Sequence, residues 1–150
     1  MTTETTDLAD RLVRRRARMM PVLAMLFVAQ QASYFSGTRM DDGRRLVNYV
    51  AISGWLMMST VLLVLLATGG SVFQSAAVRA LANDESTRAN RAAGFSLGFL
   101  ATMLSAIALY ILSLFEPLSA RETIHTLMTV GIAAALLRFG MLERRALKDG

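Results

Sequence analysis

The chain of 150 residues contains no cysteine, one histidine and two prolines. The absence of cysteine excludes disulfides, thiolate metal sites and cysteine nucleophiles. The single histidine, His125, makes a poor transition-metal site, because such sites draw on several histidine or cysteine ligands. The sequence also lacks a glycine-rich phosphate loop, a His-Glu-x-x-His pattern and carboxylates at metal-binding spacing. We therefore expect no cofactor, no metal site and no enzymatic activity.

Charge is also scarce, at 18% of the chain against about 25% in soluble proteins. Charged residues are missing from three stretches, 19–38, 46–78 and 92–115, and a fourth apolar stretch at 123–142 contains only Arg138. About 20 apolar residues in a helix span the hydrocarbon core of a bilayer, which is roughly 30 Å thick. Residues 61–66 (VLLVLL) show none of the alternation typical of a barrel strand, which favours helices.

The sequence thus predicts an all-α, membrane-embedded four-helix bundle. The predicted spans are about 19–37, 47–68, 92–115 and 122–142, and together they form one transmembrane domain at 19–142. Residues 1–18 are expected to form a basic tail and residues 143–150 a second short tail. Pro21 is expected in the first turn of the first span, where its missing N–H costs little.

Orientation follows from the distribution of lysine and arginine. Of the 16 basic residues, 12 lie in the N-terminal tail, the loop between the second and third spans, and the C-terminal end; four lie in the other two loops. The positive-inside rule therefore puts both termini in the cytoplasm, as expected for a multi-pass protein of the bacterial inner membrane. The lipid bilayer is the predicted partner, and the net charge of +5 is assigned to headgroup contacts rather than to nucleic acid.

Small residues recur every four positions on the predicted spans, which favours close helix packing inside a bilayer. These packing residues are Gly94, Gly98, Thr102 and Ala106 on the third span, Ala29 and Ser33 on the first, and Gly131 and Ala135 on the fourth. Seams within one chain are the favoured interpretation. A dimer face, and with it a homo-oligomer, is the alternative.

The loop between the second and third spans carries the most patterned polar segment. Asn83 or Asp84 is a plausible helix N-cap, and Asp84 precedes Arg88 by four residues, as in a helical ion pair. One interpretation is a capped, solvated helix start. The other is a docking surface for a cytoplasmic protein, formed by Asp84, Glu85, Arg88 and Arg91.

The Asp-Glu-x-x-Arg element at 84–88 resembles one between the second and third spans of small bacterial multi-pass proteins of uncharacterised function. The resemblance covers about a dozen residues. It implies a four-helix bacterial membrane protein and carries no activity with it. The first hypothesis is therefore a non-enzymatic membrane partner or regulator that docks a cytoplasmic protein.

Polar residues inside the predicted spans give a second hypothesis. Gln30, Gln31 and Arg138 are expected to line a water-filled cavity if the chain is a small transporter or a channel-like subunit of an oligomer. His125 is expected at the membrane interface, where loop groups would satisfy it, and its protonation is hypothesised to couple to Glu116 or Glu122. Residues 70–81 are expected to form a short interfacial helix or to extend the second span.

Overall fold

The computed structural model describes residues 3–37 and 45–149, with side chains described at 3–31 and 49–149. All regular secondary structure in these residues is helical, which confirms the all-α prediction. The helices are α1 (Thr3–Gly37), α2 (Arg45–Thr68), α3 (Ala76–Ala82), α4 (Glu85–Ser113) and α5 (Ala120–Asp149).

Within the described residues, three helical segments are long and apolar enough to cross a membrane. They are Tyr49–Thr68 of α2, Glu85–Ser113, which is all of α4, and Ala120–Asp149, which is all of α5. They overlap the second, third and fourth spans predicted from the sequence, at 47–68, 92–115 and 122–142. The first predicted span, at 19–37, lies in α1 and is not among them.

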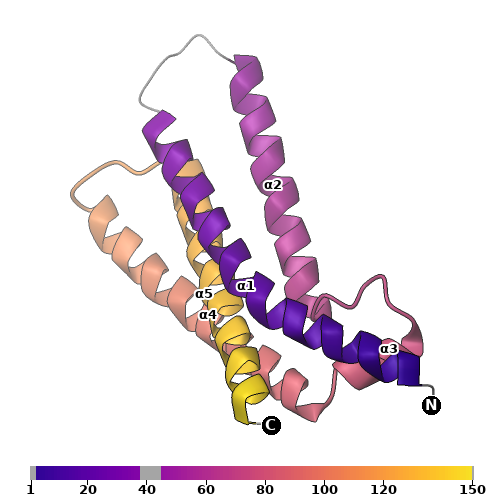
Figure 1. Ribbon diagram of the computed structural model, residues 1–150. Coiled ribbons are helices and arrows are strands. Elements are labelled where there is room, and N and C mark those ends of the chain that lie inside the picture. The colour runs from indigo at the N-terminus through magenta and orange to yellow at the C-terminus, as the bar shows by residue number, and fades with distance from the viewer. Residues whose placement is uncertain (1–2, 38–44, 150) are drawn as a thin grey trace.

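α5 is the central helix of the structure. It packs along α4 and α1 and, more lightly, against α2, while the short helix α3 packs on α1. Both chain ends lie at one end of the molecule, which we call the terminal end, and the α4–α5 connection lies at the opposite, far end (Figure 1). The order of the helices therefore puts the start of α4 at the terminal end too.

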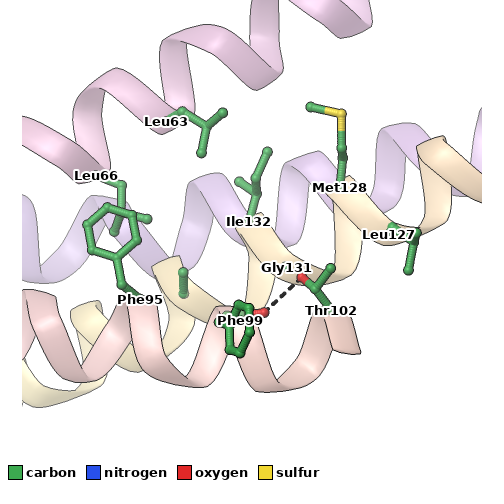
Figure 2. Close-up of a pocket in the computed structure, with 11 residues that line it drawn as sticks. Leu63, Leu66, Phe95, Phe99, Thr102, Leu127, Met128, Gly131 and Ile132 are labelled. Carbon is green, nitrogen blue, oxygen red and sulfur yellow. Dashed lines mark hydrogen bonds between the residues drawn. The ribbon is translucent and has the colours of Figure 1, made fainter. Parts of the chain in front are cut away.

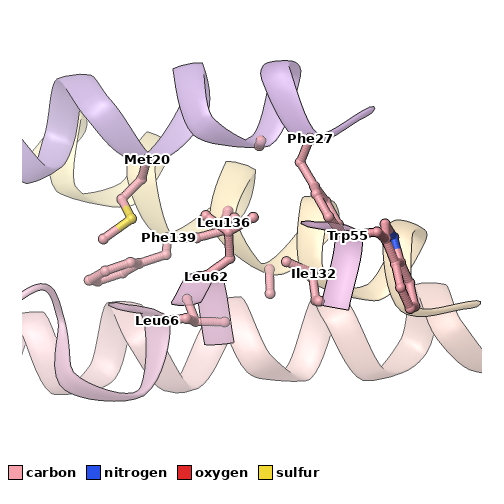
Figure 3. Packing of buried hydrophobic residues seen from close by; sticks show 10 residues of the cluster. Met20, Phe27, Trp55, Leu62, Leu66, Ile132, Leu136 and Phe139 are labelled. Carbon is pink, nitrogen blue, oxygen red and sulfur yellow. The ribbon is translucent and has the colours of Figure 1, made fainter. Parts of the chain in front are cut away.

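A continuous core joins α1, α2 and α5 (Figure 3). Each helix contributes residues spaced by three or four positions, the period of one helical face. The buried members include Met20, Ala24 and Phe27 from α1, Trp55, Leu62 and Leu66 from α2, and Ile132, Leu136 and Phe139 from α5.

The seam between α4 and α5 depends on missing side chains. A Cβ added at Gly98 would lie 2.7 Å from the carbonyl oxygen of Gly131 and 2.8 Å from Cβ of Ala135. A Cβ at Gly131 would overlap Oγ1 of Thr102, and one at Gly94 would lie 3.0 Å from the Ala135 carbonyl oxygen. The two backbones therefore approach as closely as helices do through small residues in membranes.

α1 differs from its prediction in extent, because residues 3–18 are helical rather than a separate tail. Its first turns carry a small apolar face, Ala9, Leu12 and Val13. This face packs against Val78, Leu81 and Ala82 of α3. The other predicted tail is also helical, since α5 continues to Asp149.

Pro21 consequently lies in the middle of α1 and not in its first turn. A proline at this position leaves the carbonyl of Ala17 without its usual donor. Arg144 of α5 supplies one, since its Nε donates to the Ala17 oxygen at 2.8 Å. α1 bends part-way along its length (Figure 1), as helices do at an internal proline. Gly140 makes room, because a Cβ there would lie 2.6 Å from Cδ of Pro21.

α2 ends at two glycines with left-handed backbone, Gly69 at φ 62° and Gly70 at φ 74°. The chain then turns into α3, which starts after the N-cap Ser75. The short helix predicted at 70–81 therefore begins later, at Ala76. It lies against α1, where Val78 and Ala82 are buried.

Candidate functional site

A buried ion pair joins α1 to α5 at the terminal end. Arg16 of α1 pairs with Glu143 of α5, and both side chains are 2% exposed. Nε of Arg16 donates to Oε2 of Glu143 at 2.8 Å, and Asn90 of α4 donates to the second carboxylate oxygen at 2.9 Å. The guanidinium also lies over the ring of Phe139, 5.4 Å from its centroid.

The same guanidinium satisfies groups from three further segments. Arg16 donates to the carbonyls of Gly69 and Ala82, at 3.3 and 3.2 Å, and to Oγ1 of Thr87 at 2.9 Å. The Arg16–Glu143 pair therefore joins α1 and α5 to the ends of α2 and α3 and to the first turn of α4. Buried charges persist when they are paired and fully hydrogen-bonded, as these are.

Sequence reasoning missed both members of this pair. Arg16 lies within the run of arginines from which the sequence predicts a basic tail, and Glu143 lies in the predicted C-terminal tail. A signal for Glu143 existed, because it continues at helical spacing the buried face formed by Leu136 and Phe139. No comparable local signal separates Arg16 from its neighbours.

The predicted docking residues lie at the terminal end, beside the ion pair. Asp84 is the N-cap of α4 and accepts a hydrogen bond from the backbone N–H of Thr87 at 2.8 Å. Glu85 and Arg88 are exposed, and Arg91 is half-buried. In the described structure the Asp84 carboxylate is bonded to Ser86 and Thr87 and not paired with Arg88.

Capping sets the ionisation of Asp84. Burial acts to raise the pKa of its carboxyl group, but the hydrogen bonds from Thr87 and Ser86 outweigh burial and, with the charge of Arg16, hold the pKa below its usual value. The group is therefore a carboxylate at neutral pH. Its charge also suits the N-terminal end of the α4 dipole.

A polar cavity of about 620 Å³ opens next to these residues. Its lining carries both signs of charge, with contributions from α1, α4 and α5 and from the residues before α4. The charged and hydroxyl lining residues are Asp10, Arg14, Asp84, Ser86, Thr87 and Glu143. The terminal end thus combines the buried Arg16–Glu143 ion pair with an exposed surface of mixed charge around a recess.

A second polar cluster lies toward the far end and includes His125. His125, which is expected from the sequence at the membrane interface with loop groups as partners, is buried at 3% exposure. Its ring stacks on Trp55 of α2, with centroids 3.8 Å apart, and its Nδ1 lies 3.3 Å from Nε2 of Gln31 on α1. The burial of His125 follows from its place on the face that Thr129 and Ile132 continue.

Several buried polar atoms in this cluster have no hydrogen-bond partner among the described residues: Oε1 of Gln31, Nε1 of Trp55, Oγ of Ser59 and Oγ1 of Thr129. Ser59 follows Trp55, and Thr129 follows His125, by one helical turn. Because α2 and α5 both run from the far end to the terminal end, the two hydroxyls lie at a similar depth. The core therefore contains a polar layer about one helical turn closer to the terminal end than the stacked rings.

Of the other predicted intramembrane polar residues, Gln30 also has a buried Oε1 without a hydrogen-bond partner among the described residues, whereas Arg138 does not join this layer. Gln30 is half-buried, and Arg138 is exposed on the outside of α5. Arg138 is also 13 residues beyond His125, which corresponds to about 20 Å along the helix. Gln31, which contacts His125, and Arg138 are therefore too far apart along α5 to line one small cavity together.

An apolar groove of about 330 Å³ runs over α5 between α2 and α4. Figure 2 shows Leu63 and Leu66 of α2 on one side and Phe95 and Phe99 of α4 on the other, with Ile132 of α5 between them. The hydroxyl of Thr102 donates a hydrogen bond to the carbonyl of Gly98 in its own helix, at 2.9 Å. The groove thus offers almost no hydrogen-bonding groups.

The remaining predicted packing residues are placed as follows. Ala106 is half-buried on α4, and Ala29 is exposed on α1. Ser33 lies outside the described side chains. The small-residue seam therefore joins α4 to α5, whereas α1 meets α5 through other residues, among them Pro21 at Gly140.

Comparison of the chain with protein-family models, with curated proteins and with solved structures finds no match.

Proposed function

We propose that this protein is an integral membrane protein that crosses the bilayer four times and docks a cytoplasmic protein at its terminal end. The observation that carries the docking proposal is the mixed-charge surface at the start of α4. Glu85 and Arg88 are exposed there, beside a polar recess of about 620 Å³.

Membrane insertion is supported by the three apolar helices and by their outward faces. Large apolar side chains are exposed along α2 and α4, including Met57 at 70%, Leu104 at 67% and Phe99 at 64%. Exposed apolar area of this extent is rare on soluble proteins and usual against lipid.

A fourth crossing, by α1, is supported by its packing on α5. Contacts run from Arg16–Glu143 to Gln31–His125, so 15 residues of α1, or about 22 Å, lie alongside a helix proposed to span the bilayer. With four crossings both termini and the start of α4 are on one side. The excess of lysine and arginine at these segments assigns that side to the cytoplasm of a bacterial cell.

Docking is supported by the contrast at the terminal end between charged groups that are bound within the chain and charged groups that are exposed. Arg16, Glu143 and Asp84 are bound within the chain. Glu85 and Arg88 are exposed at i and i+3 on one face of the first turn of α4. A matching partner surface presents a cation to Glu85 and a carboxylate to Arg88, which gives orientation and association rate.

The docking proposal is tested by exchanging these charges. Glu85→Lys combined with Arg88→Glu keeps the net charge and leaves the N-cap Asp84 intact. The matched control, Glu116→Lys with Arg121→Glu, makes the same exchange at the far end, where both residues are exposed. We expect cross-linked cytoplasmic partners, captured from cells and identified by mass spectrometry, to be lost only with the first pair. Equal capture by both variants would contradict the proposal.

A second candidate function, a small transporter or channel-like subunit acting as an oligomer, is favoured by the polar layer at Gln31, Ser59 and Thr129. Unpartnered polar atoms in an apolar core are costly unless a polar guest satisfies them. Flux measured in proteoliposomes, and abolished by Gln31→Leu, would support this candidate. An impermeable protein would remove it.

A further inference from the structure

A small basic cavity lies at the terminal end, between the end of α2, α3 and the second turn of α4. It measures about 290 Å³. Its described lining includes the two arginines Arg79 and Arg91, the polar residues Thr68, Ser71 and Asn83, and no carboxylate. The cavity is thus positively charged as well as polar.

Part of the wall is held in place by hydrogen bonds within the chain. Nδ2 of Asn83 donates to Oγ of Ser71 at 3.0 Å, and that hydroxyl donates to the carbonyl of Thr68 at 2.6 Å. Nη2 of Arg79 donates to the carbonyl of Gln74 at 3.2 Å. The wall is therefore preorganised, and Arg79 retains further N–H groups, since a guanidinium carries five.

Gly69 brings the backbone close to the second arginine. A Cβ added at Gly69 would lie 2.8 Å from Oδ1 of Asn83 and 3.7 Å from Nη1 of Arg91. The left-handed backbone of Gly69, at φ 62°, independently excludes most side chains. The Arg91 guanidinium is therefore directed toward the end of α2, on the side where the cavity lies.

Two guanidinium groups around a recess without a carboxylate match a phosphate group. Arginine binds phosphate through paired, charge-assisted hydrogen bonds, and its planar fork fits the tetrahedral oxygens. Asp84 follows the lining residue Asn83 in the sequence, but its carboxylate is hydrogen-bonded to Ser86 and Thr87. An anion in the cavity would also relieve the repulsion between the two cations.

The surroundings of the cavity point to a lipid as the source of that phosphate. The apolar segment of α2 ends at Thr68, which lines the cavity, so the cavity lies at the level where hydrocarbon gives way to headgroups. The next segment exposes Phe73 at 96% and Val72 at 38%. Exposed aromatic side chains at this depth are typical of a protein surface in contact with the bilayer interface.

We propose that the cavity between α2, α3 and α4 binds a phosphate group through Arg79 and Arg91, and that this phosphate is the headgroup of an anionic phospholipid. Basic pockets on the cytoplasmic side of transmembrane helices suit such headgroups. The proposal rests on the membrane crossing of α2 in the proposed function and is independent of protein docking, which uses Glu85 and Arg88.

The test titrates phosphatidylglycerol into the full-length protein in a neutral detergent and counts bound lipid by native mass spectrometry. We expect one tightly bound lipid and weaker binding of zwitterionic phosphatidylcholine. Arg79→Gln with Arg91→Gln should weaken phosphatidylglycerol binding about 100-fold or more, because each charge-assisted hydrogen bond contributes about tenfold. The matched control, Arg138→Gln with Arg145→Gln, removes two exposed arginines outside the cavity and should change binding by less than about twofold.

Arg79→Lys with Arg91→Lys provides a milder variant that keeps the charges and the fold. It loses the planar fork and should bind phosphatidylglycerol about tenfold more weakly than the wild type. If the glutamine or lysine variants retain the lipid as well as the Arg138/Arg145 control, the proposal is overturned. Inorganic phosphate is titrated in parallel; binding of phosphate with no gain for phosphatidylglycerol would support the phosphate site and overturn the lipid source.

Discussion

Replacing Arg16 by methionine tests how much of the structure depends on one buried contact. Methionine keeps an unbranched stem of similar reach but removes the guanidinium. Glu143 would then be a buried carboxylate with Asn90 as its remaining donor. The carbonyls of Gly69 and Ala82 and the hydroxyl of Thr87 would lose a donor as well.

The size of the effect follows from this geometry. Removing one partner of a buried ion pair costs about 3–5 kcal/mol, because the other charge stays uncompensated. Glu143→Met should cost a similar amount. The double variant removes both charges, so its main cost is the two carbonyls that lose donors, at about 1 kcal/mol each. We therefore expect about 2 kcal/mol for the double variant, far below the sum of the two single variants.

Trp55 allows these losses of unfolding free energy to be measured, because it is the only tryptophan of the chain and lies in the core at 5% exposure. Its fluorescence reports unfolding in mixed micelles of a mild detergent and SDS, from which the free energies of the four proteins are compared. If the losses of the two single variants simply add in the double variant, the charges are not coupled, and the fastening ascribed to Arg16 and Glu143 is refuted.

Three further predictions concern the helices and their ends. Gly98→Ala should destabilise by about 1–3 kcal/mol and Gly98→Leu by more, whereas Gly54→Ala, with open space around it, should stabilise by about 0.5–1 kcal/mol in the same unfolding assay; equal effects would contradict the close α4–α5 seam. Arg144→Gln should cost about 1–3 kcal/mol by leaving the Ala17 carbonyl without its donor, and pairing it with Pro21→Ala should recover most of that loss. Asp84→Ala should cost about 1 kcal/mol and Asp84→Asn only a few tenths, as thermal unfolding will report. Because the folded pKa of Asp84 is lowered, the ionic part of its contribution is complete above about pH 4 and is lost as the pH falls through the folded value; a wild-type advantage over Asp84→Asn that grows toward low pH would contradict this.

The sequence was informative where one local pattern decides the outcome. The uncharged stretches at 46–78 and 92–115 predict long apolar helices, and most of α2 and most of α4 lie in these stretches. The N-cap at Asp84 follows from residue type and position alone. These features depend on composition and periodicity within one helix.

Features that depend on contacts between distant segments were not predictable. Arg16 and Glu143 are 127 positions apart, and nothing local distinguishes this arginine from Arg14 or Arg15. The helical start of α1 was hidden because its arginines mask the apolar spacing of Ala9, Leu12 and Val13.

The stacking of His125 is a third case, because its partner Trp55 is a residue of another helix. Hydropathy alone predicts that a lone histidine near a helix end lies at the membrane interface. The stacked partner is visible only after α2 and α5 are brought together.

We propose that the chain crosses the bilayer four times with both termini in the cytoplasm. Because the protein contains no cysteine, single cysteines at exposed positions report topology without background. We propose four variants, Asp7→Cys, Arg88→Cys, Glu116→Cys and Lys148→Cys, labelled in intact bacterial cells with a membrane-impermeant maleimide. We expect labelling of the Glu116→Cys variant alone in intact cells, and of the other three variants only after permeabilisation. Labelling of the Asp7→Cys or Lys148→Cys variant in intact cells would contradict it.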